Sequence, residues 1–170
     1  PPRSTLFPYT TLFRSDKNKN KLILGIDPGR DKIGFAFVNF SGDLICSGIF
    51  HKRNVNKFIN IIKTGEFWEL LNYIIEGHIP ENNSDLQLIF IGNGTHSHDL
   101  IKIIQEFGHG RMTVIDEKNS TIEAKNLYWK IHKPGFLLKF IPEKLRSPGR
   151  DVDDLAAWVI ALRGIKNFEL

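Results

Sequence analysis

Apolar runs and alternating apolar positions along the chain predict an α/β domain in which three strands come first. Residues 22–26, "LILGI", form a short continuous apolar run of the kind that buried strands show. The segment "NFSGD" has the turn residues of a β-hairpin and separates the second predicted strand from the third. The five predicted strands are residues 22–26, 33–39, 43–50, 86–92 and 111–116.

Apolar residues at helical spacing predict four helical segments, which alternate with the later strands and close the chain. They are residues 55–77 (at least in the second half), 97–108, 119–129 and 151–162. In the first, Phe67, Leu70 and Ile74 recur every three or four residues, and Gly77 is expected to end the run. The predicted order is therefore βββαβαβ, followed by helices.

Capping residues indicate where two of these helices begin. Ser97 is expected to cap a helix that starts at the next residue, and Ser120 with Glu123 has the spacing of a capping box. The last helix, "DVDDLAAWVIAL", begins with three acids in four residues. A helix N-terminus favours acids through its dipole alone, so this run has a structural as well as a functional interpretation.

The first fifteen residues, "PPRSTLFPYTTLFRS", have neither helical nor strand periodicity and resemble the translation of a sequencing adapter. We treat 1–15 as a non-native segment and expect residues 16–170 to form a single domain. Without Arg3 and Arg14 the formal net charge falls from +4 to +2. The basic composition is therefore only a weak indication of nucleic-acid binding.

Hydropathy and cysteine content narrow the class of protein. No apolar run approaches the roughly 20 residues of a membrane span, so we expect a soluble protein. The single cysteine, Cys46, lies in the apolar stretch "DLICSGIF" and is expected in the core. One thiol excludes an intrachain disulfide and a thiolate metal site, and a cytoplasmic location fits.

Acidic residues follow the predicted strands at the places where α/β proteins form their sites. Asp27 follows the first strand, and Asp116 and Glu117 follow the last, while the final helix adds Asp153 and Asp154. Convergent carboxylates repel one another unless protons or hard cations such as Mg²⁺ neutralise them. Two such cations would activate a water and stabilise the leaving oxygen of a phosphodiester.

Four motifs in order resemble those of ribonuclease H-like nucleases of the YqgF/RuvC group. "GIDPGRDKIGFAFV" is similar to the first-strand motif of both branches, and "VDDLAAWVIAL" is similar to their last helix. "IGNGTHS" and "VIDEKNSTIEA" resemble the middle motifs of YqgF-type and related Tex domains. The resemblance spans about residues 22–164.

The resemblance implies a ribonuclease H-like fold, with a five-stranded mixed sheet of βββαβαβα order flanked by helices. It also implies metal-dependent phosphodiester hydrolysis with Mg²⁺ or Mn²⁺ and, in the YqgF branch, maturation of the ends of ribosomal RNA precursors. The catalytic acids fall on Asp27, Glu117 and Asp153, which would also bind metal, with Asp154 as an adjacent candidate ligand. RuvC resolvases carry an acid after the fourth strand, where this chain has "GNG", and this departure favours the YqgF branch.

Several polar residues are candidates for contacting nucleic acid. They are Arg30, Lys32, Asn93, Thr95, Lys144, Arg146 and Arg150. The connection 130–150 is basic and contains Phe136 and Phe140, with Trp129 directly before it, which suits phosphate contact and base stacking. The segment "GNGTHSHD" is either a plain turn with a helix cap or a backbone nest for a phosphate.

The protein is expected to be a monomer or a homodimer. Three functions are alternatives to YqgF-like processing of RNA. A Holliday-junction resolvase would act as a dimer on a four-way DNA junction, and a non-catalytic module would bind structured nucleic acid without cutting it. A sugar kinase or actin-like ATPase needs two lobes of this topology, and one domain of this size cannot supply both. Metal-dependent processing of structured RNA is therefore the favoured prediction.

Overall fold

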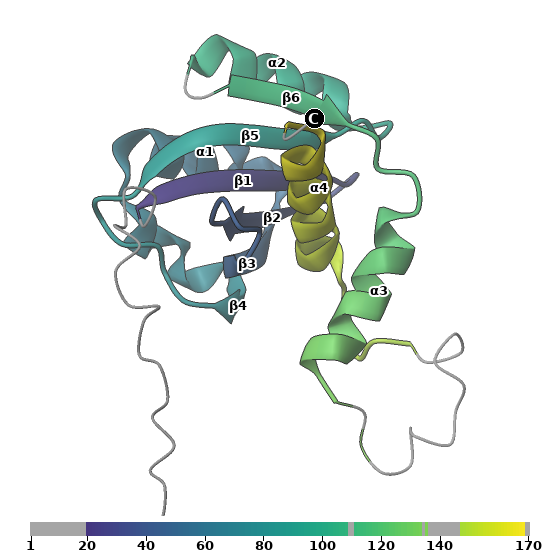
Figure 1. The fold of residues 1–170 in the computed structure, drawn as a ribbon. Coiled ribbons are helices and arrows are strands. Elements are labelled where there is room, and N and C mark those ends of the chain that lie inside the picture. The colour runs from purple at the N-terminus through teal and green to yellow at the C-terminus, as the bar shows by residue number, and fades with distance from the viewer. Residues whose placement is uncertain (1–19, 109–110, 134, 136–146, 169–170) are drawn as a thin grey trace, which may run out of the picture.

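The structure, a computed structural model, describes residues 20–108, 111–133, 135 and 147–168. The segment 1–15 lies outside these residues. The fold is α/β, with a six-stranded mixed sheet flanked by helices and a strand order of β4-β3-β2-β1-β5-β6 (Figure 1). The strands are β1 Lys21–Pro28, β2 Lys32–Val38, β3 Leu44–His51, β4 Ile74–Gly77, β5 Asp85–Gly92 and β6 Arg111–Ile115. The helices are η1 Lys52–Asn54, α1 Val55–Thr64, η2 Phe67–Asn72, α2 Ser97–Phe107, α3 Ser120–Ile131 and α4 Asp153–Phe168.

Strand direction brings the carboxyl ends of three strands to one edge of the sheet. β1 is antiparallel to β2 and parallel to β5, and β5 is parallel to β6. Ile26 pairs with Ile91, and Gly92 pairs with Ile115. The residues that follow β5 and β6 are therefore neighbours of the end of β1.

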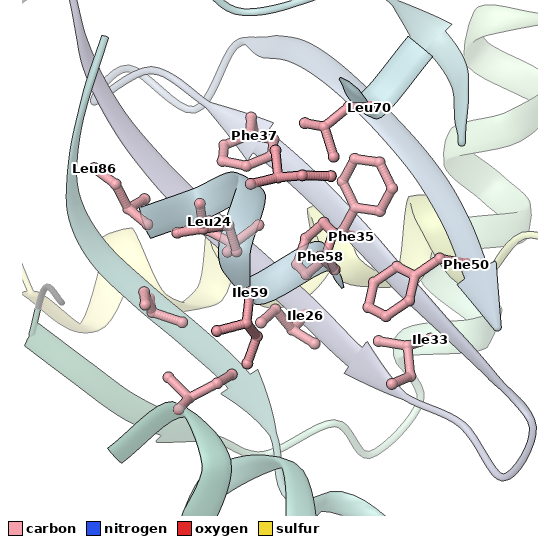
Figure 2. Close-up of a cluster of buried hydrophobic side chains, with 14 of the residues drawn as sticks. Leu24, Ile26, Ile33, Phe35, Phe37, Phe50, Phe58, Ile59, Leu70 and Leu86 are labelled. Atoms are coloured by element: carbon pink, nitrogen blue, oxygen red, sulfur yellow. The ribbon is translucent and has the colours of Figure 1, made fainter. Parts of the chain in front are cut away.

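The sheet buries a different apolar set on each face. On one face the side chains of β1 and β2, among them Leu24, Ile26 and Phe35, pack with Phe58 of α1 (Figure 2). Phe50 stacks on Phe58 with ring centroids 4.2 Å apart. Full burial of a side chain of this size stabilises the fold by about 1.5–3 kcal/mol relative to exposure.

The opposite face of the sheet is covered by α4, which crosses it on the side away from α1 (Figure 1). Ile160 and Ala161 of α4 pack with Ile23 and Phe90. A methyl group on Gly34 of β2 would overlap the backbone of Asp153, so the small residue lets the first turn of α4 approach the sheet. This approach fixes where the acids at the start of α4 lie.

The prediction of a continuous helix in the second half of 55–77 is wrong, and the sheet has six strands rather than five. α1 ends at Thr64, the next residue is Gly65 with a left-handed φ of 72°, and a 3-10 helix follows. Ile74 and Ile75 then lie in β4, which pairs with β3. The three-to-four spacing of the apolar residues persists across this break, but their burial alternates in β4 as it does in an edge strand.

Both predicted caps are also wrong. Ser97 is the first residue of α2 and Ser120 the first of α3, and neither helix has a side-chain cap hydrogen bond. Asn119, with a φ of 65°, occupies the cap position of α3, and Glu123 instead pairs with Arg163 of α4. Tertiary contacts and the turn before α3 therefore decide these helix starts.

The prediction that Cys46 lies in the core is confirmed. Cys46 is buried, and burial raises the pKa of its thiol to about 12. Among the helices that the structure describes, none combines the length and apolarity that crossing a membrane requires.

Candidate active site

Asp27 lies inside β1, as its penultimate residue, rather than just past the strand. It pairs with Gly34 of β2 and shares the α4 side of the sheet with Ile23 and Gly25, because strand side chains alternate between faces. Burial raises the pKa of Asp27 to about 7, and repulsion from Glu117 and Asp153 adds to the shift. The three predicted acids therefore interact electrostatically at one edge of the sheet.

Glu117 reaches this edge from the turn between β6 and α3. Its Oε2 is buried and has no hydrogen-bond partner among the described residues. A methyl group on either Gly92 or Gly94 would overlap the carboxylate, which thus occupies space that these two glycines leave open. The backbone N–H of Glu117 donates to Oδ1 of Asn93 at 3.1 Å, and the N–H of Asn93 donates to the carbonyl of Ile115 at 3.0 Å.

Asp153 is the first residue of α4 and is partly buried. Burial raises the pKa of its carboxyl group, as does repulsion from Asp151, while Lys32 acts in the opposite direction. Lys32 Nζ lies 2.5 Å from Oδ2 of Asp151, and this hydrogen bond raises the pKa of Lys32 and lowers that of Asp151. The positively charged side chain of Lys32 therefore lies at the exposed side of the acidic group.

Asp154 does not join this group, although the sequence makes it a candidate ligand beside Asp153. Its carboxylate is fully buried and accepts hydrogen bonds from Ser47 Oγ at 2.8 Å and from Arg150 at 2.7 Å. Both carboxylate oxygens of Asp154 therefore already have hydrogen-bond partners within the protein. Of the adjacent acids, Asp153 is thus the one that the fold presents beside Asp27.

Arg150 extends this buried network to the edge strand. Its guanidinium also donates to Glu76 of β4 at 2.6 Å, and Nε2 of His132 lies 2.7 Å from the same oxygen. Burial acts to raise the pKa of Glu76, but the hydrogen bonds from Arg150 and His132 outweigh it and hold the pKa below its usual range. The arginine therefore ties α4 to the sheet.

The other residues predicted to contact nucleic acid differ in exposure and in their partners within the protein. Arg30 and Thr95 are exposed, in the β1–β2 turn and in the loop before α2 respectively, and Lys32 pairs with Asp151. Asn93 directs its side-chain oxygen at the Glu117 backbone. Lys144 and Arg146 lie outside the described residues.

The sequence does not indicate the part that several residues play in shaping this site. Gly92 and Gly94 are expected from their pattern to turn the chain or bind phosphate, whereas in the structure they leave space for the Glu117 carboxylate. Arg163 of α4 donates to the carbonyls of Asp116 and Lys118, at 2.6 and 2.9 Å. An arginine near the end of an apolar helix has no spacing or motif that would mark it.

The donor set fits a hard divalent cation. Asp27, Glu117 and Asp153 supply carboxylate oxygens, which Mg²⁺ and Mn²⁺ prefer, and the Glu117 oxygen is left without a hydrogen bond within the described residues. Within residues 20–108, 111–133, 135 and 147–168, no three acid, histidine or cysteine side chains form a ready-made metal-binding group. The fit therefore rests on the unpartnered Oε2 of Glu117 and on the electrostatic repulsion of Asp27 by Glu117 and Asp153.

In comparisons with known proteins, no family model matches this chain, and no curated protein matches it. The relationship to YqgF and RuvC nucleases therefore stays a prediction from the motifs.

Replacing Gly94 with alanine is expected to displace the Glu117 carboxylate while leaving the fold intact. The added methyl group would overlap the end of a flexible side chain rather than backbone, so the side chain moves and the sheet does not. A displacement of about 1 Å costs roughly 10²-fold in rate at a well-aligned site. The measurements are the metal-dependent cleavage of nucleic acid that the sequence predicts and a thermal melt. Full activity in Gly94→Ala would show that the position of Glu117 is unimportant.

Proposed function

We propose that this chain is a divalent-cation-dependent nuclease of ribonuclease H-like fold that hydrolyses phosphodiester bonds in structured nucleic acid. Processing of ribosomal RNA precursor ends, as in the YqgF branch, is the favoured role. The observation that carries the proposal is the position of Asp27 at the end of β1, close enough to Glu117 of the β6–α3 turn and to Asp153 of α4 for both to repel its carboxylate. The order of strands and helices supports the same family of folds.

Asp27, Glu117 and Asp153 would hold Mg²⁺ or Mn²⁺. When bound, such a cation polarises a phosphoryl oxygen and lowers the pKa of a water so that it can attack. The chain supplies rigidity, because Asp27 lies in a strand hydrogen-bonded to β2 and Asp153 starts a helix whose backbone rests on Gly34. Carboxylates held in this way lose little freedom when they bind a cation.

The surroundings of the acids suit a polyanionic substrate. Arg30 is exposed in the turn that follows Asp27, and Lys32 is exposed beside Asp151. Both basic residues are within a few residues of Asp27 along the chain, so their side chains can offset the phosphate charge of a substrate next to the acids. No base-reading motif accompanies them in the sequence, which favours recognition of structure or ends over sequence.

Affinity for Mn²⁺ is expected to rise about tenfold between pH 6 and pH 8. With a pKa of about 7, the Asp27 carboxyl is roughly one-tenth ionised at pH 6 and nine-tenths ionised at pH 8, and only the ionised form is a good ligand. Calorimetric titration with Mn²⁺ at both pH values measures this change. A pH-independent affinity, or the same rise in Asp27→Asn, would contradict the role of Asp27.

The raised pKa of Asp27 also makes the stability of the fold depend on pH. Because the folded-state pKa of Asp27 lies above its unfolded value, the folded protein binds more protons between about pH 4 and pH 7. This carboxyl therefore contributes stability that falls as the pH rises through that window. Bound cation would offset the loss.

Cleavage of labelled substrates by the full chain tests the proposed function. The substrates are a structured RNA, a single-stranded RNA and a DNA four-way junction, each with Mg²⁺, Mn²⁺ or EDTA. Cation-dependent cutting of structured RNA supports the processing nuclease, whereas symmetric cutting of the junction indicates a resolvase. Salt-sensitive binding without cutting under any of these conditions would show a binding module and would refute the catalytic role of the acids.

A further inference from the structure

Arg163 of α4 makes two hydrogen bonds to the turn that carries Glu117 and one to α3, the helix that follows it. It donates to the carbonyl of Asp116 at 2.6 Å, to the carbonyl of Lys118 at 2.9 Å and to the carboxylate of Glu123 at 2.7 Å. Its side chain is mostly buried, at 24% exposure. The guanidinium thus holds the backbone on both sides of Glu117.

The rest of that turn is also held by hydrogen bonds. The N–H of Glu117 donates to Asn93, the N–H of Lys118 donates to Oδ1 of Asp116, and the N–H of Ser120 donates to the carbonyl of Glu117. These bonds fix the turn locally and to β5. Among the described residues, only Arg163 connects it by side-chain hydrogen bonds to α4, the helix that begins with Asp153.

We propose that Arg163 is a positioning residue that fixes Glu117 relative to Asp153, so that both acids present their carboxylates to one cation. This inference rests on the proposed function. The planar guanidinium suits the task, because its fixed N–H groups reach two carbonyls at once, which a lysine ammonium on a flexible stem does less well. Partners that orient metal ligands in this indirect way typically change metal affinity by about 10–100-fold when they are lost.

The contact between Arg163 and Glu123 provides a matched control. It joins α4 to α3 on the surface, with Glu123 52% exposed, and it does not touch the Glu117 backbone. If Arg163 acted only by holding α3, Glu123→Gln would have the same effect as loss of the arginine. If it acts on the turn, Glu123→Gln leaves the site unchanged.

The test compares the wild type with Arg163→Met, Arg163→Lys, Glu123→Gln and Asp27→Asn. We expect the Mn²⁺ dissociation constant, measured by calorimetry, to rise at least about tenfold in Arg163→Met and less in Arg163→Lys. Glu123→Gln is expected to bind as the wild type does. Thermal melts confirm folding, and Arg163→Lys keeps the test valid where Arg163→Met does not fold.

Amide exchange of Glu117, followed by NMR without metal, is the second readout. We expect faster exchange in Arg163→Met and unchanged exchange in Glu123→Gln, because only the first loosens the turn. Wild-type exchange in Arg163→Met, or a loss of Mn²⁺ affinity in Glu123→Gln equal to that in Arg163→Met, overturns the positioning role. Faster exchange in Arg163→Met together with no Mn²⁺ binding by the wild type supports the positioning of Glu117 and refutes the proposed function instead.

Discussion

Replacing Asp27 with asparagine is expected to lower cation-dependent cleavage by about 10³-fold. The amide keeps the shape of the side chain but removes the charge that binds the cation, and cation catalysis is worth several kcal/mol, with each 1.36 kcal/mol equal to about tenfold in rate. The neutral amide would also avoid the burial of a charge and the repulsion from Glu117 and Asp153, which together raise the pKa of Asp27, so the variant should be at least as stable as the wild type. Cleavage rate and thermal melt, measured on the same samples, separate these effects.

Asp43→Asn is the matched control for this experiment. Asp43 lies next to the β2–β3 hairpin turn, at the end of the sheet opposite Asp27, where its carboxylate accepts a hydrogen bond from Asn39. The same change from carboxylate to amide there should leave cleavage unaltered. Equal losses in the two variants, or retained cleavage in Asp27→Asn, would show that Asp27 has no special part in the reaction.

Replacing Asp154 with alanine is expected to lower the free energy of unfolding by about 1–3 kcal/mol, the usual cost of leaving a buried donor without its acceptor. The change leaves Ser47 without its acceptor and removes one of the two carboxylate partners of Arg150, with Glu76 remaining. Urea unfolding at pH 7 measures the loss.

Asp151→Ala is the control for that measurement, because the same residue type lies three positions earlier and is exposed. Its ion pair with Lys32 is at the surface, where such pairs contribute about 0–1 kcal/mol. Similar losses in the two variants would mean that the Asp154 network does not hold α4 to the sheet.

Much of the sheet can be predicted from the sequence, because buried strands have a local signature. The runs that form β1, β2, β3, β5 and β6 are apolar and bounded by turn residues, so each is predicted within a few residues of its position. The segment 65–77 is misleading because helical spacing and strand pairing compete there. Pairing of β4 with β3 decides the outcome, and that contact is not local.

The candidate site is predictable only in part, for a similar reason. Asp27 and Glu117 can be recognised in the sequence because each lies at or just after the carboxyl end of a predicted strand. The carboxyl ends of parallel strands lie at the same edge of a sheet. The choice between Asp153 and Asp154 depends on which side of α4 faces Ser47 and Arg150, which the apolar pattern of the helix does not encode. The contact of Arg163 with the Glu117 turn depends on how α4 packs, so it appears only in three dimensions.

The most direct test of the central claim is an anomalous-scattering map from a crystal of the full chain grown with Mn²⁺. We expect a peak coordinated by carboxylate oxygens of Asp27 and Glu117, with Asp153 beside it and Asp154 still bound to Arg150. Mn²⁺ bound only elsewhere, or no Mn²⁺ peak at a concentration that supports cleavage, would contradict the assignment of these acids as the cation site.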